Sequence, residues 1–106
     1  MNFRYMRVLV FFDLPVTTAA GRRAYTTFRK FLIKDGFFMM QESVYCKIAL
    51  NQQSSNAIVE QIKNNKPDCG LVQVLVITEK QYSNIVHVVG DNKSDVINSS
   101  ERLVVL

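Results

Sequence analysis

The sequence predicts an α+β domain in which strands and helices follow the order β-α-β-β-α-β, with extra strands at the C-terminal end. Short apolar runs rich in Val, Ile and Phe, bounded by polar or proline-containing stretches, indicate the strands. Two segments instead place apolar residues at helical spacing. The chain has 106 residues, which suits a single domain over residues 1–106 that buries a core without disulfides.

The first strand is expected at Met6–Phe12, within the stretch "MRVLVFFDLPV". Its residues are apolar on both alternating faces, which is typical of a central strand that is covered on both sides. Asp13 ends the run, and Pro15 biases Leu14 toward an extended backbone. The role of Asp13 therefore needs an explanation, because a strand whose residues are expected to be buried ends at a carboxylate.

The first helix is expected to run from a cap at Thr17 or Thr18 to about Asp35, with Gly36 just past its end. At about 100° per residue, its apolar and cationic side chains fall in two opposite arcs. The apolar arc contains Ala24, Tyr25, Phe28, Phe31 and Leu32. The cationic arc contains Arg22, Arg23, Arg29, Lys30 and Lys34. The helix therefore offers one face to a sheet and a positive face to solvent or to a partner.

Two strands are expected after this helix, at Phe37–Met40 and Val44–Ala49. Polar Gln41 and Glu42 separate the two runs and indicate a break between them. Both runs are rich in aromatic, β-branched or other apolar residues, which fit a half-buried pleated surface.

A second helix is expected at Ala57–Asn65, after a polar loop at 51–55 that offers several caps. Pro67 and Gly70 mark its end. The residues predicted to face inward are Ala57, Ile58 and Ile62.

The C-terminal part predicts a strong strand at Leu71–Thr78, in which the single polar residue of the apolar run, Gln73, is expected to face a wetter side. A polar connector at 90–101 comes later in the chain. The other predicted elements are one helical turn at Glu79–Ser83, a fifth strand at Ile85–Val89 and a final strand at Arg102–Leu106. Residues 90–106 are therefore interpreted as a C-terminal strand extension.

This order of elements is that of the ferredoxin-like, split β-α-β fold. Two helices on one face of the sheet leave the other face to be covered. The first strand places Val8 and Val10 on one side and Leu9 and Phe11 on the other, so helices on one side cannot cover both. A second copy packing face to face would do so, which predicts a homodimer in which residues 90–106 pair with an edge of the partner.

The formal charge of +4 is unevenly distributed along the chain. Residues 1–50 carry eight Lys and Arg against three acidic residues, whereas residues 51–106 carry five against six. A basic half suggests a polyanionic partner, although an ordinary basic surface explains the charge equally well. The cationic arc of the first helix is the candidate contact, because it can neutralise phosphates without reading bases. The alternative is a solvated helix face.

Several classes of protein are excluded by what the sequence lacks. Cys46 and Cys69 form no C-x-x-C motif and are interpreted as buried free thiols of a reducing cytosol. No apolar run reaches the roughly 18 residues of a membrane helix, and no secretory signal is expected. The single histidine, His87, has no metal-ligand spacing around it, and no glycine-rich phosphate loop or hydrolase motif is present.

Asp13 is the one candidate for a chemical role, because of its position at the end of a strand. A carboxylate at the end of a rigid strand can hold Mg²⁺, which takes one or two carboxylates together with waters and phosphate oxygens. One aspartate per chain supplies few ligands for such a site. Two aspartates related by a dimer axis are adequate for a metal that activates water or stabilises a phosphodiester transition state. The alternative is an aspartate that begins a turn before proline, which is common. Both interpretations stay open at this point.

Three stretches and the basic helix, taken in order, resemble the small CRISPR-associated endonuclease of the spacer-acquisition machinery. This is the second of the CRISPR-associated proteins, in the form that accompanies single-effector systems of bacteria. The stretches are "MRVLVFFDLPV", "FLIKDGFFMMQESVYCKI" and "VLVITEKQYSNIVHVVGD". The resemblance extends from Tyr5 to Leu106, and it rests on the ordered set because no single motif is specific.

The resemblance implies a ferredoxin-like homodimer with C-terminal strand exchange, in which a catalytic Asp13 faces its symmetry mate and binds Mg²⁺, with Mn²⁺ as the alternative ion. It implies a metal-dependent endonuclease or endoribonuclease, a hydrolase of phosphodiester bonds in RNA or DNA, in the bacterial cytoplasm. It also implies a dimer that bridges two dimers of the CRISPR integrase, the first CRISPR-associated protein, and supports double-stranded DNA. Single-stranded RNA is the other expected substrate.

Among the basic residues, the resemblance assigns duplex contacts first to Arg22 and Arg23, and then to Arg29, Lys30 and Lys34. One departure from the family pattern is that no basic residue lies between Asp13 and Thr18, where some relatives have one.

Two other functions remain open. A purely structural DNA-binding adaptor needs no chemistry from Asp13, which has no general base beside it in the sequence. A ferredoxin-like ligand-sensing domain is disfavoured by the charge asymmetry and by the lack of a small-molecule fingerprint.

Overall fold

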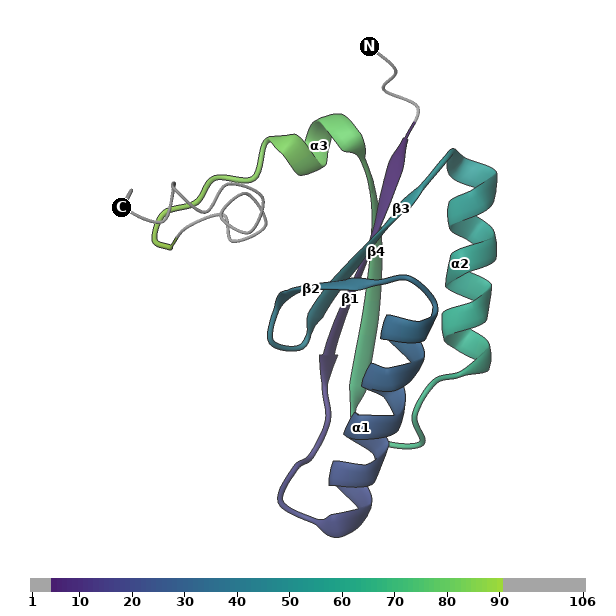
Figure 1. Cartoon of the computed structure of the whole chain (residues 1–106), viewed down its shortest axis with the longest axis vertical. Coiled ribbons are helices and arrows are strands. Elements are labelled where there is room, and N and C mark those ends of the chain that lie inside the picture. Colours follow the sequence, from purple (N-terminus) through teal and green to yellow (C-terminus); the bar gives the residue numbers. More distant parts are fainter. Residues whose placement is uncertain (1–4, 91–106) are drawn as a thin grey trace.

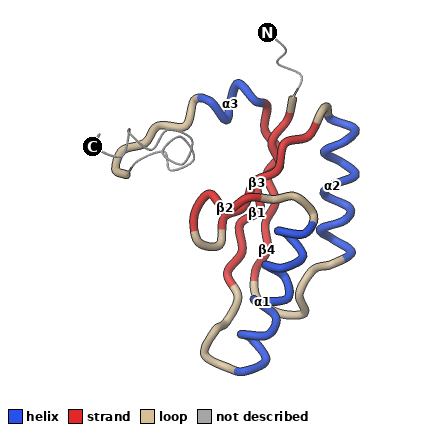
Figure 2. The backbone as a smooth tube through the Cα atoms, viewed as in Figure 1, coloured by secondary structure: helices blue, strands red, loops and turns tan. Residues whose placement is uncertain are grey.

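The computed structural model describes residues 5–90 and confirms the predicted α+β order (Figure 1). The elements, in chain order, are β1 (Met6–Asp13), α1 (Ala19–Lys34), β2 (Phe38–Gln41), β3 (Val44–Ala49), α2 (Gln52–Asn64), β4 (Leu71–Thr78) and α3 (Glu79–Ser83). Figure 2 shows the strands gathered into one layer, with α1 and α2 lying beside it.

The four strands form one antiparallel sheet in the order β2-β3-β1-β4. β1 pairs with β3 on one side and with β4 on the other, which confirms that it is a central strand. Its register with β4 runs unbroken from Met6 opposite Thr78 to Asp13 opposite Leu71. β2 and β4 are the edges of the sheet. The arrangement is consistent with the predicted ferredoxin-like fold.

Both long helices cover the same face of the sheet, so the core lies between α1, α2 and one side of β1 (Figure 1). Val8, Val10 and Phe12 alternate along β1 onto this face and are at most 5% exposed. The ring of Phe12 meets that of Phe28 edge-on, with 5.2 Å between the ring centroids. The other buried members of this core are Leu14, Leu32, Phe37, Tyr45 and Ile62.

The structure confirms the predicted caps and faces of the first helix. The side-chain oxygen of Thr18 accepts a hydrogen bond from the backbone N–H of Gly21 at 3.0 Å, which satisfies a free donor of the first turn. After the helix ends, Gly36 takes a φ of +99°, a conformation that favours glycine. Phe28 and Leu32 are buried, whereas all five residues of the cationic arc are exposed.

The second helix begins at Gln52, five residues earlier than predicted. Asn51 caps it by accepting a hydrogen bond from the N–H of Ser54 at 2.8 Å, so the predicted polar loop at 51–55 is wrong. Ser55 is fully buried, and its hydroxyl donates to the carbonyl oxygen of Gln52 at 2.7 Å. This local bond lets a polar residue occupy the inner face of the helix. Ala57, which was predicted to face inward, is exposed.

Two other predictions are wrong. Ile85–Val89 forms no strand, because within residues 5–90 the run has no neighbouring strand to hydrogen-bond with. Cys46 is buried as predicted, but Cys69 lies in the turn before β4 and is exposed. The final strand at 102–106, and the predicted connector and extension beyond Gly90, lie outside the described residues.

The loop between Asp13 and α1 is held by two close backbone approaches at glycines. A Cβ atom at Gly21 would overlap the carbonyl oxygen of Pro15 and lie 2.8 Å from its carbonyl carbon. Gly70 has a φ of +83°, and a Cβ there would overlap the Leu14 side chain and lie 2.7 Å from the Asp13 carbonyl oxygen. Both glycines are therefore required for the tight turn that directly follows Asp13.

We predict that Gly21→Ala lowers the free energy of unfolding by about 1–3 kcal/mol, the usual range for overpacking. In an open helix interior the same change would raise it by about 1 kcal/mol, so the sign of the effect is diagnostic. Urea unfolding followed by circular dichroism measures it. Ala57→Gly at an exposed position of α2 is the control and should cost about 1 kcal/mol. A stabilised Gly21→Ala protein would contradict the close approach.

Candidate metal and nucleic-acid site

Asp13 is the last residue of β1, and its side chain is exposed. Successive side chains of a strand point to opposite faces, so Asp13 shares the helix-free face of the sheet with Leu9 and Phe11. We call this helix-free face the open face. Within residues 5–90, Asp13 takes part in none of the three salt bridges. Its carboxylate is therefore available to a cation.

The open face is apolar and only partly covered. Leu71 and Leu75 of β4 are 54% and 48% exposed, and Ile48 of β3 is 50% exposed. In the register of the sheet, Leu71 lies opposite Asp13 and Leu75 lies opposite Leu9, with the exposed Gln73 between them opposite Phe11. An exposed apolar face on a small domain is typical of an interaction surface.

The described residues bring no cluster of metal-ligating side chains together around Asp13. Among residues 5–90 there is no group of three or more His, Cys, Asp or Glu side chains that could hold an ion. A hard carboxylate oxygen suits Mg²⁺, which binds through one or two carboxylates and keeps several waters. The exposed Asp13 carboxylate is therefore chemically suited to be one of the ligands of such an ion.

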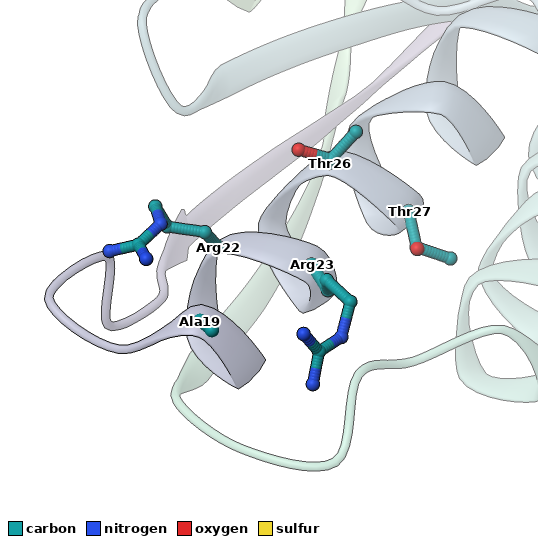
Figure 3. A pocket seen from close by; sticks show the side chains of 5 residues that line it. All are labelled: Ala19, Arg22, Arg23, Thr26 and Thr27. Atoms are coloured by element: carbon teal, nitrogen blue, oxygen red, sulfur yellow. The ribbon is translucent and has the colours of Figure 1, made fainter.

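The cationic arc lies on the outer surface of α1. Its first two arginines line a shallow hollow together with Ala19, Thr26 and Thr27 (Figure 3). Arg22 is directed toward the loop before the helix, where its Nη1 donates a hydrogen bond to the carbonyl oxygen of Val16 at 3.2 Å. Two guanidinium groups and two hydroxyl groups at one hollow can all donate hydrogen bonds to phosphate oxygens.

The other three cations are not part of the hollow. Arg29 donates from Nε to the hydroxyl of buried Tyr45 at 2.9 Å, so one of its donors already serves the core. Lys30 and Lys34 are exposed farther along the helix. The structure thus places Arg22 and Arg23 at one hollow, with their side chains directed away from each other (Figure 3), and places Arg29, Lys30 and Lys34 farther toward the C-terminal end of α1. Sixteen residues of helix are about 24 Å long, enough to follow several phosphates of a backbone.

The sequence prediction missed Thr26 and Thr27. At the helical spacing that gathered the five cations, Thr26 falls within the same arc and Thr27 falls just beside it, so the signal was present. They were overlooked because hydroxyl side chains carry no charge. A hydroxyl group at a cationic surface is able to donate a directed hydrogen bond to a phosphate.

Comparison with known proteins identifies the family. The model of the family described as CRISPR associated protein Cas2 matches residues 6–85. The chain belongs to the Cas2 family. A Cas2 relative from Treponema denticola is 54% identical over 101 residues, covering 95% of this chain and 100% of that protein. Relatives from Streptococcus mutans and Lacticaseibacillus rhamnosus are each 42% identical over 95% of this chain, covering 93% and 100% of those proteins.

All three relatives are named CRISPR-associated endoribonuclease Cas2. Among solved structures, one titled "Crystal structure of cas2" matches with a TM-score of 0.51 and 23% sequence identity, covering 85% of this chain and 92% of that chain. This match supports the fold. The resemblance found in the sequence is therefore confirmed. Within residues 5–90, no helix is long and apolar enough to cross a membrane.

Proposed function

We propose that this chain is a metal-dependent endoribonuclease of a bacterial CRISPR system, active as a homodimer. The observation that carries the proposal is the placement of Asp13: an exposed carboxylate in no ion pair within the described residues, at the end of the central strand, on the apolar open face. The names of the relatives support nuclease activity on RNA. Such a function places the chain in the bacterial cytoplasm, and DNA is the alternative substrate.

The dimer follows from the open face. Its half-exposed Leu71, Leu75 and Ile48 gain most from burial against an equally apolar surface, and a second copy offers the same surface. In a two-fold arrangement the aspartates lie on the buried face of both copies. Two carboxylates brought together repel each other unless a cation lies between them. Dimerisation and metal binding are thus linked in this proposal.

Mg²⁺, or Mn²⁺ in its place, would be held by Asp13 from each chain and would supply charge stabilisation and an activated water for phosphodiester hydrolysis. The chain itself contributes a rigid ligand. β1 is hydrogen-bonded on both sides, and the turn after Asp13 is fixed by the glycine contacts at Gly21 and Gly70. A rigidly held carboxylate keeps its geometry when the substrate binds.

A second function is favoured by one feature of the structure. The hollow lined by Arg22 and Arg23 lies on the outer side of α1, whereas Asp13 lies on the open face, on the opposite side of the sheet. A backbone bound along α1 can therefore be supported without its phosphates reaching Asp13. This separation suits a DNA-binding adaptor that holds duplex DNA and bridges integrase dimers during spacer acquisition, with no need for hydrolysis.

We predict that Asp13→Asn abolishes Mg²⁺-dependent cleavage of single-stranded RNA, because a neutral amide is a poor ligand for a hard divalent cation. The free energy of unfolding should change by less than about 0.5 kcal/mol, since the side chain is exposed. Gel-based cleavage assays with and without EDTA measure the activity. Asp68→Asn, at an acid in the turn before β4, is the matched control and should cleave normally. Undiminished cleavage by the Asp13 variant would assign the activity to another site or to a contaminant.

We predict that replacing Arg22 and Arg23 together by Gln weakens duplex binding and flattens its salt dependence. The slope of log K against log salt should fall by about 0.9 for each phosphate that the protein no longer neutralises. Thr26→Val with Thr27→Val should weaken binding without changing the slope, because a hydroxyl carries no charge. Lys63→Gln on α2 should change neither. Binding is measured by fluorescence anisotropy at several salt concentrations, and an unchanged slope for the double arginine variant would remove these residues from the contact surface.

A further inference from the structure

Arg29, on the cationic arc of α1, is held by a side chain of the core. Its Nε donates a hydrogen bond to the hydroxyl oxygen of Tyr45 at 2.9 Å. Tyr45 belongs to β3 and is 1% exposed, whereas Arg29 is exposed. A buried tyrosine hydroxyl usually needs a hydrogen-bond partner, and here the partner comes from the surface of the helix. The contact therefore joins the core to the cationic arc.

The ring of Tyr45 has little freedom to move. It stacks on the ring of Phe12, with 5.6 Å between the ring centroids and 28° between the ring planes. The strand that carries it, β3, is hydrogen-bonded to β1 on one side and to β2 on the other. The hydroxyl oxygen of Tyr45 is therefore a fixed point to which the Nε of Arg29 is attached.

The backbone of α1 is fixed near Arg29 as well. Phe28 and Leu32, which lie before and after Arg29 in the helix, are 2% and 0% exposed. Beyond the last turn, the ammonium group of Lys47 donates a hydrogen bond to the backbone carbonyl oxygen of Asp35 and lies 3.6 Å from the Asp35 carboxylate. Both ends of the Arg29 side chain, its Cα and its Nε, are thus held by the folded domain.

The two Nη groups of Arg29 stay available. Within residues 5–90, Arg29 takes part in none of the three salt bridges, and its side chain makes the one hydrogen bond from Nε. A guanidinium has five N–H donors in one plane, and four of them are on Nη1 and Nη2. Two parallel donors of this plane match two oxygens of a phosphate. The bond to Tyr45 therefore fixes the plane without using the pair of Nη groups.

Arg22 is held in a different way. Its Nη1 donates to the carbonyl oxygen of Val16, so one of its two Nη groups is already engaged with the loop before the helix. Arg29 follows Arg22 by seven residues, which is nearly two full turns, so the two residues lie on the same side of α1. The rise along the axis between them is about 10.5 Å. Arg29 is therefore placed to meet a different phosphate from the one at Arg22.

We propose that Tyr45 is a positioning residue for phosphate binding, because its hydroxyl holds the Arg29 guanidinium ready to contact a backbone phosphate of a duplex along α1. This inference rests on the duplex binding of the proposed function and deepens it. The freedom of the Arg29 side chain is lost when the domain folds and not when the duplex binds, which favours binding. Arginine suits this role, since its Nε is held while its Nη groups bind, and a lysine has no equivalent.

The test is duplex binding by Tyr45→Phe, measured by fluorescence anisotropy at several salt concentrations. The variant keeps the ring in the core and loses only the hydroxyl, so its circular dichroism should match that of the wild type. The dissociation constant should rise about three- to tenfold, the usual effect of one hydrogen bond. The slope of log K against log salt should stay unchanged, because no charge is removed.

Tyr25→Phe is the matched control. The Tyr25 ring also packs on Phe12, with 5.5 Å between the centroids, but within residues 5–90 its hydroxyl makes no contact with a cation of the arc. This variant should bind the duplex like the wild type. Equal weakening by Tyr25→Phe and Tyr45→Phe would overturn the inference, because the loss would then come from the packing around Phe12.

A double-mutant cycle with Arg29→Gln separates positioning from a general effect on the fold. Arg29→Gln removes a charge, so the slope of log K against log salt should fall by about 0.9. If Tyr45 acts through Arg29, adding Tyr45→Phe to Arg29→Gln should weaken binding no further. Additive losses, an unchanged slope for Arg29→Gln, or wild-type binding by Tyr45→Phe would each overturn the inference.

A measurement on the free protein distinguishes this inference from the proposed function. In nitrogen-15 NMR spectra, the signal of the Arg29 Nε–H is the one that Arg29→Gln removes. It should exchange slowly with solvent in the wild type and rapidly in Tyr45→Phe, and rapid exchange in the wild type would overturn the positioning role. Slow exchange in a wild-type chain that binds no duplex would instead overturn the proposed duplex binding, and with it the role of the pair toward phosphate.

Discussion

The two-sided apolar character of β1 is the constraint on which the rest of the structure depends. Val8, Val10 and Phe12 are covered by the helices on one side of the sheet, whereas on the other side Leu9 is buried but Phe11 is only partly covered. The part of the chain that the structure describes has two long helices and places both on the first side. On the second side, the described residues supply only the short helix α3 at one end. The open face is therefore a consequence of how few elements a domain of this size possesses.

The same constraint explains the position of the candidate ligand. A carboxylate is disfavoured inside a strand whose two faces are both to be buried, but it is tolerated at the end of that strand. Asp13 stands at that end, directly before a turn that two glycines hold in place. At the other end of the open face the charge on Arg7 is neutralised by Glu79. One end of the face thus carries a paired charge, and the other end carries a carboxylate available to a cation.

Much of this could be predicted from the sequence, because the relevant signals are local. The central strand, the cap at Thr18 and the two arcs of the first helix all follow from residues close together in the chain. The start of α2 was mistaken because its first turn is polar and satisfied by local hydrogen bonds at Asn51 and Ser55. A strand at Ile85–Val89 cannot be judged from its residues alone, since a strand exists only with a neighbour. The ion pair between Arg7 and Glu79 escaped notice because it joins residues 72 positions apart.

The most direct test of the central claim is the stoichiometry of Mn²⁺ binding to the purified protein, measured by titration with electron paramagnetic resonance detection. If one carboxylate per chain is half of a metal site, one ion binds per two chains, and Asp13→Asn abolishes that binding while the dimer persists. An ion bound to each chain independently, or binding that survives in the Asp13 variant, would contradict the account.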